Sequence, residues 1–212
     1  MTSPPSERLG TKVERLDGTQ AARRANLAMK IGIVVAFAVA ILVPFDHLEG
    51  KAMGLRAPLF VGAAAVVPFV EAVRKRKHDP YPHTADALVV APFLVDTLGN
   101  LLGAYEAFPA TDDVLHCVNW ILLVMAFQAF RFRRTSSTVD AVLIGAGFGA
   151  LAIVAWEIME WVVDETGAGG GLGLTYGDTI GDLALSTTGG IIGAIAGLRL
   201  FGPEPGPDVS EP

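Results

Sequence analysis

The sequence predicts an all-α polytopic membrane protein, a bundle of six transmembrane helices with both termini in the cytoplasm. Three observations lead to this prediction: the composition, the length of the apolar stretches, and the distribution of Lys and Arg. Hydrophobic residues make up 51% of the 212 residues and charged residues only 18%, with a mean hydropathy of +0.47. Soluble domains carry about 25% charged residues. This chain therefore has too little charge to cover a soluble surface, and it is too apolar for a disordered protein.

Six apolar stretches are long enough to span a bilayer, since a helix needs roughly 20 residues to cross about 30 Å of hydrocarbon. They cover residues 26–45, 57–73, 85–108, 114–132, 139–163 and 179–201. The transmembrane domain is therefore expected over residues 26–201. The polar segment 1–25 is expected to be a disordered cytoplasmic tail. Residues 202–212, in which proline alternates with acidic residues, are expected to form a second one.

Lys and Arg in the short loops predict the orientation, because basic loops stay in the cytoplasm. Basic residues precede the first span and follow the second, fourth and sixth, including the run Arg74-Lys75-Arg76-Lys77. Only Lys51 and Arg56 fall on the other side. We interpret the basic runs as loop anchors at a lipid surface. The expected partner is thus the lipid bilayer and not nucleic acid. The chain has a single cysteine, Cys117, which excludes a disulfide framework within the chain.

Polar residues of four spans fall at one predicted depth, in the outer half of the membrane. They are Asp96 and Asn100, Asp112 and His116, Glu157 and Glu160, and Asp178 and Asp182. Residues three or four positions apart share one face of a helix. Each of these spans therefore presents one polar stripe, and the stripes are expected to line a single cavity that opens outward.

The acids among these residues need compensation, because an acidic side chain near the bilayer centre costs about 2.5–3.5 kcal/mol. Lys51 and Arg56 are expected to reach at most one or two of them. Three interpretations remain open for the others: hydrogen bonds between helices, a divalent-metal site, or a proton or cation pathway. So many acids at one depth argue against hydrogen bonding alone.

The leading hypothesis is a divalent-cation site whose ligands are His116, Glu157, Glu160 and Asp182. Asp96, Asn100, Asp112 and Asp178 are expected to be further ligands or to support the ligands. The spacings of Glu157 with Glu160 and of Asp112 with His116 are those that helix bundles use for metal sites. The sequence contains no HExxH or ExxH motif, so the identity of the metal stays open, and no catalytic residue is assigned.

Three classes of function are compatible with such a site. In an enzyme, the metal would activate water against a lipid or envelope substrate, with a carboxylate as base. A proton-coupled or metal-ion transporter would need a polar route to the cytoplasm. Only Glu71 and Asp86 lie near the inner ends of the spans, and both are expected to snorkel to the interface. A structural or partner-binding membrane protein is the third class.

Small residues form two further patterns in the last two spans. Gly145 and Gly149 make a GxxxG face, and Gly189, Gly193 and Gly197 extend the same spacing along the sixth span. Such faces favour close helix packing. They also allow a homo-oligomer.

The order and spacing of the polar motifs resemble a known family. The motifs are Asp96-x3-Asn100-x4-Tyr105, Asp112-x3-His116, Trp156-Glu157-x2-Glu160 and Tyr176-Gly177-Asp178-x3-Asp182. They resemble the YjdF-like family of bacterial inner-membrane proteins over roughly residues 85–200, and the final helix is more loosely similar to VanZ-like proteins. The resemblance implies a multi-pass protein of the bacterial cytoplasmic (inner) membrane without an established activity. Its pattern carries over to Asp112, His116, Glu157, Glu160, Asp178 and Asp182, whereas Ser186 stands where an acid or amide is expected.

Overall fold

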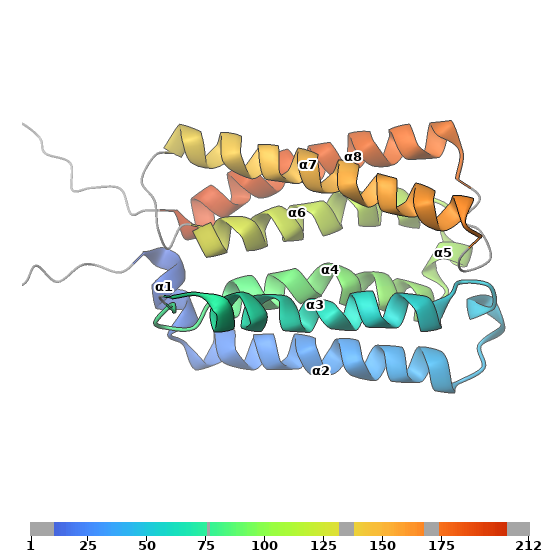
Figure 1. The fold of residues 1–212 in the computed structure, drawn as a ribbon, viewed down its shortest axis with the longest axis horizontal. Helices are drawn as coiled ribbons and strands as arrows, with labels where there is room; N and C mark the ends of the chain where they lie inside the picture. The colour runs from blue at the N-terminus through green and yellow to red at the C-terminus, as the bar shows by residue number, and fades with distance from the viewer. Residues whose placement is uncertain (1–10, 76, 132–137, 168–173, 203–212) are drawn as a thin grey trace, which may run out of the picture.

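Six long helices run alongside one another and form a bundle (Figure 1). The computed structural model describes residues 11–75, 77–131, 138–167 and 174–202. The long helices are α2 (Gln20–Leu42), α3 (Met53–Val73), α4 (His83–Leu101), α6 (Thr111–Arg131), α7 (Thr138–Glu165) and α8 (Tyr176–Phe201). All six are long and apolar enough to cross a membrane, and the described residues contain no strand. The predicted all-α six-helix bundle is confirmed.

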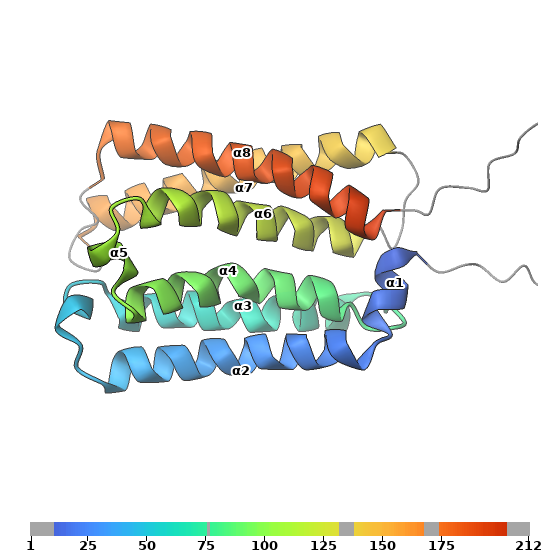
Figure 2. The same cartoon turned by 180° about the vertical axis from the view of Figure 1, so that it is seen from behind.

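The bundle consists of two groups of three helices (Figure 2). Helices α2, α3 and α4 pack together, as do α6, α7 and α8, and the contact between α4 and α6 joins the groups. The short helix α1 (Lys12–Asp17) packs on α2, α4 and α8 at one end of the bundle. The short helix α5 (Ala104–Ala107) lies at the opposite end. We call these the α1 end and the α5 end.

The chain becomes helical earlier than the hydropathy predicts. Helix α2 begins at Gln20 because the side chain of Thr19 accepts a hydrogen bond from the Ala22 amide and caps the helix. Thr11 and Glu14 form a capping box that starts α1. Residues 11–25, expected to belong to a disordered tail, are thus mostly helical. The expectations for residues 1–10, Arg76 and 203–212 lie outside the described residues.

Asp17 ties α1 to the start of α4. Its carboxylate is buried and accepts a hydrogen bond of 2.6 Å from the backbone amide of Thr84. The first amides of a helix have no partner within the helix. The segment that precedes the first span therefore supplies one of the acceptors that α4 needs.

The predicted third span, 85–108, ends early and is followed by a turn. Helix α4 stops at Leu101, and Gly103 has a φ of 67°, a conformation that side chains disfavour. The chain then forms α5 and folds back over the α5 end. This turn brings Tyr105 within hydrogen-bonding distance of Asp96.

Glycines hold α8 in very close contact with α6. A Cβ atom on Gly189 would lie 2.2 Å from the carbonyl oxygen of Cys117, and one on Gly193 would lie 2.6 Å from that of Ile121. On α7, Gly149 lies against Val124 and Gly190 in the same way. Both glycine faces predicted to favour helix packing are therefore occupied within one chain, and neither is left open as a surface for an oligomer.

Asp86 is fully buried near the α1 end and has three partners. Its Oδ2 atom lies 2.6 Å from Lys30 Nζ and accepts hydrogen bonds from Asn26 Nδ2 at 2.9 Å and from the Tyr81 hydroxyl at 2.8 Å. Burial and the hydrogen bond to Asp86 raise the pKa of Tyr81 above its ordinary value, so this hydroxyl stays a donor. The expectation that Asp86 snorkels to the interface is wrong.

Glu71 is also buried, with partners from the loop that follows α3. It accepts a hydrogen bond of 2.8 Å from the backbone amide of His78, and its Oε1 lies 2.7 Å from His78 Nδ1 and 3.5 Å from Arg74 Nη1. This side chain does not snorkel either. Both carboxylates have partners within the protein, although Asp86 Oδ1 itself has no hydrogen-bond partner among the described residues.

Replacing Asp86 by Ala is expected to destabilise the protein by about 3–5 kcal/mol, because it removes one partner of a buried ion pair and leaves Lys30 uncompensated. Chemical unfolding in detergent measures the change. The control is Glu49→Ala, which removes an exposed carboxylate at the other end of the bundle. Equal stability of the two variants would contradict the prediction.

Candidate metal site

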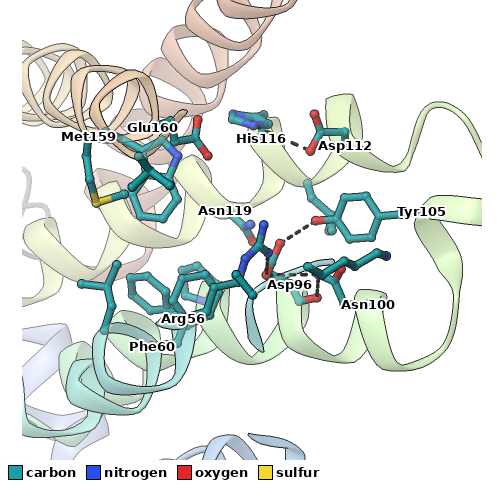
Figure 3. Close-up of a pocket in the computed structure, with 18 of the residues that line it drawn as sticks. Arg56, Phe60, Asp96, Asn100, Tyr105, Asp112, His116, Asn119, Met159 and Glu160 are labelled. Carbon is teal, nitrogen blue, oxygen red and sulfur yellow. Dashed lines mark hydrogen bonds and ion pairs between the residues drawn. The ribbon is translucent and has the colours of Figure 1, made fainter. Parts of the chain in front are cut away.

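A cavity of about 430 Å³ lies between the two groups of helices, toward the α5 end (Figure 3). Helices α3, α4, α6 and α7 supply most of its lining. The polar lining residues include Arg56, Asp96, Asn100, Tyr105, Asp112, His116, Asn119 and Glu160. The apolar ones include Leu59, Phe60, Phe93, Trp120, Leu123, Trp156 and Met159. The prediction that polar stripes of several helices line one cavity thus agrees with the structure for α4 and α6, whereas α7 contributes Glu160 without Glu157 and neither Asp178 nor Asp182 of α8 lines this cavity.

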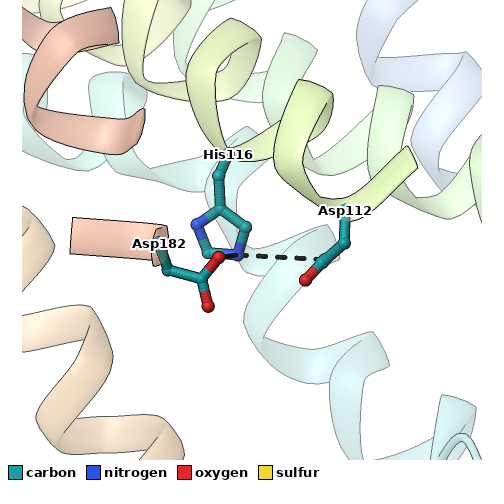
Figure 4. A group of neighbouring side chains, drawn as sticks. All are labelled: Asp112, His116 and Asp182. Carbon is teal, nitrogen blue, oxygen red and sulfur yellow. Dashed lines mark ion pairs between the residues drawn. The ribbon is translucent and has the colours of Figure 1, made fainter. Parts of the chain in front are cut away.

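Asp112, His116 and Asp182 form the group in the described chain whose ligand atoms lie closest together (Figure 4). One ligand atom from each residue lies within 4.8 Å of the others. His116 Nε2 is 3.5 Å from Asp182 Oδ1 and 3.8 Å from Asp112 Oδ1. Two of these residues belong to α6 and the third to α8, so the close contact of the two helices assembles the group.

Ser186 orients the imidazole of this group. Its hydroxyl is buried and lies 3.1 Å from His116 Nδ1. With Nδ1 engaged there, Nε2 faces both carboxylates. Metal-bound histidines commonly have such a partner on the second ring nitrogen. The serine that departs from the family-like pattern therefore has a supporting role.

The donor set of this group fits a divalent metal ion. Two carboxylates and one imidazole suit Zn, Mn or Fe, and three protein ligands leave positions for water or substrate. Asp182 is 4% exposed, whereas about half of the Asp112 side chain is exposed. The group can thus hold an ion at the boundary between protein and cavity.

The remaining predicted ligands on α7 and α8 are divided between two places. Glu160 lines the same cavity as His116. Glu157 is 7% exposed, its Oε1 has no hydrogen-bond partner among the described residues, and it lines a second pocket between α7 and α8. Asp178, one turn before Asp182, is exposed. The structure therefore brings His116 and Asp182 together with Asp112 and not with Glu157.

Asp96 belongs to a separate set of contacts on the opposite wall. It accepts a hydrogen bond of 2.5 Å from the Tyr105 hydroxyl and forms a 3.6 Å ion pair with Arg56 Nη1. Asn100 Nδ2 donates to the Asp96 carbonyl at 3.0 Å. Asp96 and Asn100 were predicted to assist the metal ligands. In the structure they instead form hydrogen bonds and an ion pair with each other and with Tyr105 and Arg56.

Two cations at the α5 end are paired with acids. Arg56 pairs with Asp96, and Lys51 pairs with Glu106 at the mouth of the cavity, where its Nζ also lies 5.3 Å from the centre of the Tyr105 ring. The hydrogen bond to Lys51 lowers the pKa of Glu106. The expectation that Lys51 and Arg56 reach one or two acids is confirmed.

Tyr105 is a functional candidate that was not among the predicted site residues. Burial and the nearby charges of Asp96 and Asp112 raise the pKa of its hydroxyl above the ordinary value, while Arg56 lowers it. The hydroxyl is therefore a neutral donor toward Asp96. In the sequence, Tyr105 stands only in the family-like motif Asp96-x3-Asn100-x4-Tyr105, and nothing there predicts the turn at Gly103 that folds it back.

The comparisons with known proteins give one match. The family model described as Predicted membrane protein (DUF2238) matches residues 25–202, which include most of α2, the other five long helices and every residue of the cavity. The match supports a membrane family and does not extend to the finer YjdF-like or VanZ-like resemblance. Neither a curated protein nor a solved structure matches the chain.

Proposed function

The chain belongs to the DUF2238 family of predicted membrane proteins, and we propose that it binds a divalent metal ion at Asp112, His116 and Asp182. The observation that carries this proposal is the placement of three ligand atoms, from two helices, within 4.8 Å of one another at a cavity. In our proposal the α5 end faces outward from a bacterial cytoplasmic membrane, because the loops at the α1 end carry most of the Lys and Arg residues.

Glu160 is the carboxylate best placed to assist the ion, since it lines the same cavity from α7. It serves as a fourth ligand or as the base that accepts a proton from water. A divalent metal supplies a water molecule of lowered pKa and polarises an oxygen of the substrate. We propose a reaction of this class on a lipid or envelope compound. Glu157 supports the site from the second pocket.

The apolar lining of the deep part of the cavity favours this reading over transport. A transporter needs a polar route that continues from the cavity to the α1 end. The deep part of the cavity is lined by Phe60, Trp120 and Trp156, and Asp86 is already paired with Lys30. The close contact of α8 with α6 leaves no room for a path between these two helices. Transport of protons or metal ions is the alternative that these contacts disfavour.

The metal content of the purified protein tests the proposal. We expect a near-stoichiometric divalent ion by mass spectrometry after purification in detergent without chelators. After treatment with a chelator, the protein should bind added Zn, Mn or Ca again. Absence of metal in the purified protein and no binding on addition of all three would overturn the proposal. The Glu157→Gln/Glu160→Gln double variant tells whether the acids of α7 contribute.

A further inference from the structure

The cavity is polar at one end and apolar at the other. Arg56, Asp112 and His116 lie within the first turns of their helices at the α5 end, whereas Phe60 and Trp120 follow one turn deeper. The same order appears in Figure 3, where Phe60 lies on the left and Asp112, Asn100 and Tyr105 lie on the right, toward the α5 end. A ligand that fills this space needs a charged group at one end and an apolar part at the other. The cavity volume of about 430 Å³ is in the range of small-molecule sites.

The two side walls of the cavity belong to different groups of helices. Leu59 lies on the α3 wall and Met159 on the α7 wall, while α4 and α6 form the floor between them. Helices α4 and α6 pack together, whereas α3 and α7 meet through the rings of Phe60 and Trp156, whose centroids are 6.4 Å apart. Both walls lie on the same side of the bundle, in front of α4 and α6 in Figure 1. In a bilayer, this side faces the acyl chains.

The wall residues of α3 are consistent with contact to lipid. Leu55 and Leu59 line the cavity and yet are 52% and 48% exposed. They thus border both the cavity and the space that lipid would fill. An acyl chain can therefore pass between α3 and α7 without leaving an apolar environment, and burial of its methylene groups there is favourable.

Arg56 provides the group that recognises an anion. Its guanidinium has five N–H donors, and the contact with Asp96 is a single one at 3.6 Å. The remaining donors can bind a phosphate, for which the planar guanidinium is well suited. A metal ion at Asp112, His116 and Asp182 would place a second positive charge at the same end of the cavity.

We propose that the cavity binds a phosphate-bearing membrane lipid, with the phosphate between Arg56 and the metal site and an acyl chain between α3 and α7. The lipid comes from the bilayer through the side between these helices. The metal ion, as the second positive charge, comes from the proposed function, on which this part of the inference rests. Binding by Arg56 and by the apolar walls is independent of the metal. It names the substrate class of the site as a phospholipid of the outer leaflet.

Photo-crosslinking in vesicles tests this inference. The full chain is reconstituted in phosphatidylcholine vesicles that contain a minor fraction of phosphatidic acid with a diazirine in its acyl chain. Arg56→Gln removes the phosphate donors, and Leu59→Trp fills the apolar part of the cavity. The control is Leu151→Trp, on the surface of α7, where Leu151 is 77% exposed and does not line the cavity. The metal content of each sample is measured in parallel.

We expect crosslinking to fall about tenfold in Arg56→Gln, because the charged donors to the phosphate are lost. We expect a similar fall, about tenfold, in Leu59→Trp, because the larger side chain fills the space of the acyl chain, and no change in the control. Crosslinked peptides should map to α3 and α7. Crosslinking that is insensitive to both variants in a metal-loaded protein would overturn this inference and leave the metal site intact.

Three further outcomes separate the two proposals and the nature of the ligand. Crosslinking that depends on Arg56 and Leu59 in a protein that binds no metal would support the lipid cavity and overturn the metal site. Loss of crosslinking on addition of inorganic phosphate alone would overturn a lipid in favour of a free phosphate. Stronger competition by a single-chain cationic amphiphile than by phosphatidic acid would overturn the assignment of a phosphate.

Discussion

Replacing Asp112 by Asn is expected to lower the affinity for a divalent metal by on the order of 100-fold. The loss of a group that only supports a ligand already lowers metal affinity by about 10- to 100-fold, and Asp112 is placed to bind the ion itself. About half of its side chain is exposed, so the exchange should leave the fold intact. Competition with a chromophoric chelator in detergent measures the affinity.

The next residue of the chain provides the control. Asp113→Asn makes the same change of charge on α6, but Asp113 is exposed and does not belong to the group around His116. We expect wild-type affinity for this variant and a loss in Asp182→Asn similar to that in Asp112→Asn. If Asp112→Asn and Asp113→Asn bind the metal equally well, the carboxylate of Asp112 is not a ligand.

Replacing Gly189 by Ala is expected to destabilise the protein by about 3 kcal/mol, the upper end of the usual cost of overpacking. The new Cβ atom would lie 2.2 Å from the carbonyl oxygen of Cys117. Because the obstacle is backbone, relief requires α8 to move away from α6. That movement would also separate Asp182 from His116, so the affinity for metal should fall together with the midpoint of thermal unfolding.

Gly181 and Gly147 give matched controls, since nothing lies within 4 Å of a Cβ atom at either position. Ala in a helix interior is more stable than Gly by roughly 0.5–1 kcal/mol, so Gly181→Ala and Gly147→Ala should unfold at the same temperature as the wild type or higher. If the Gly189→Ala protein unfolds at the same temperature as these controls, the contact between α6 and α8 is not as close as described.

Hydropathy alone was sufficient to locate the six spans, because a membrane helix must be apolar over its whole length. It could not locate the caps. Thr19 starts α2 at Gln20, six residues before the expected boundary, and the positive φ of Gly103 ends the third span before residue 108. Both features depend on single polar or small residues, which have little weight in an average over about 20 positions.

The places of the polar residues along their helices were predictable, but their partners were not. The spacing of Asp112 and His116 places them on one face of a helix, whichever helix they meet. The packing of α8 on α6 places Asp182 beside Asp112 and His116 as the third member of the group. Glu157 lines another pocket. Arg56 reaches Asp96 because α3 lies beside α4, a relation that no spacing in the sequence contains.

The burial of Asp86 was missed for a related reason. An acid near the end of a span usually reaches the interface, and the sequence gives no sign that Lys30 and Asn26 lie beside it. These partners are about 60 residues away along the chain, in α2. Long-range pairs of this kind are set by the arrangement of helices, which the hydrophobic pattern leaves undetermined.

Three of the ion pairs described above also have an order in time, because a ribosome makes the chain from the N-terminus. Lys30 is synthesised before Asp86, Lys51 before Glu106, and Arg56 before Asp96. In each pair the cation is therefore in place at the membrane before its acid emerges. Each acid of these pairs thus enters the membrane after the cation with which it pairs. The earlier helices therefore lower the free-energy cost of inserting the later acids.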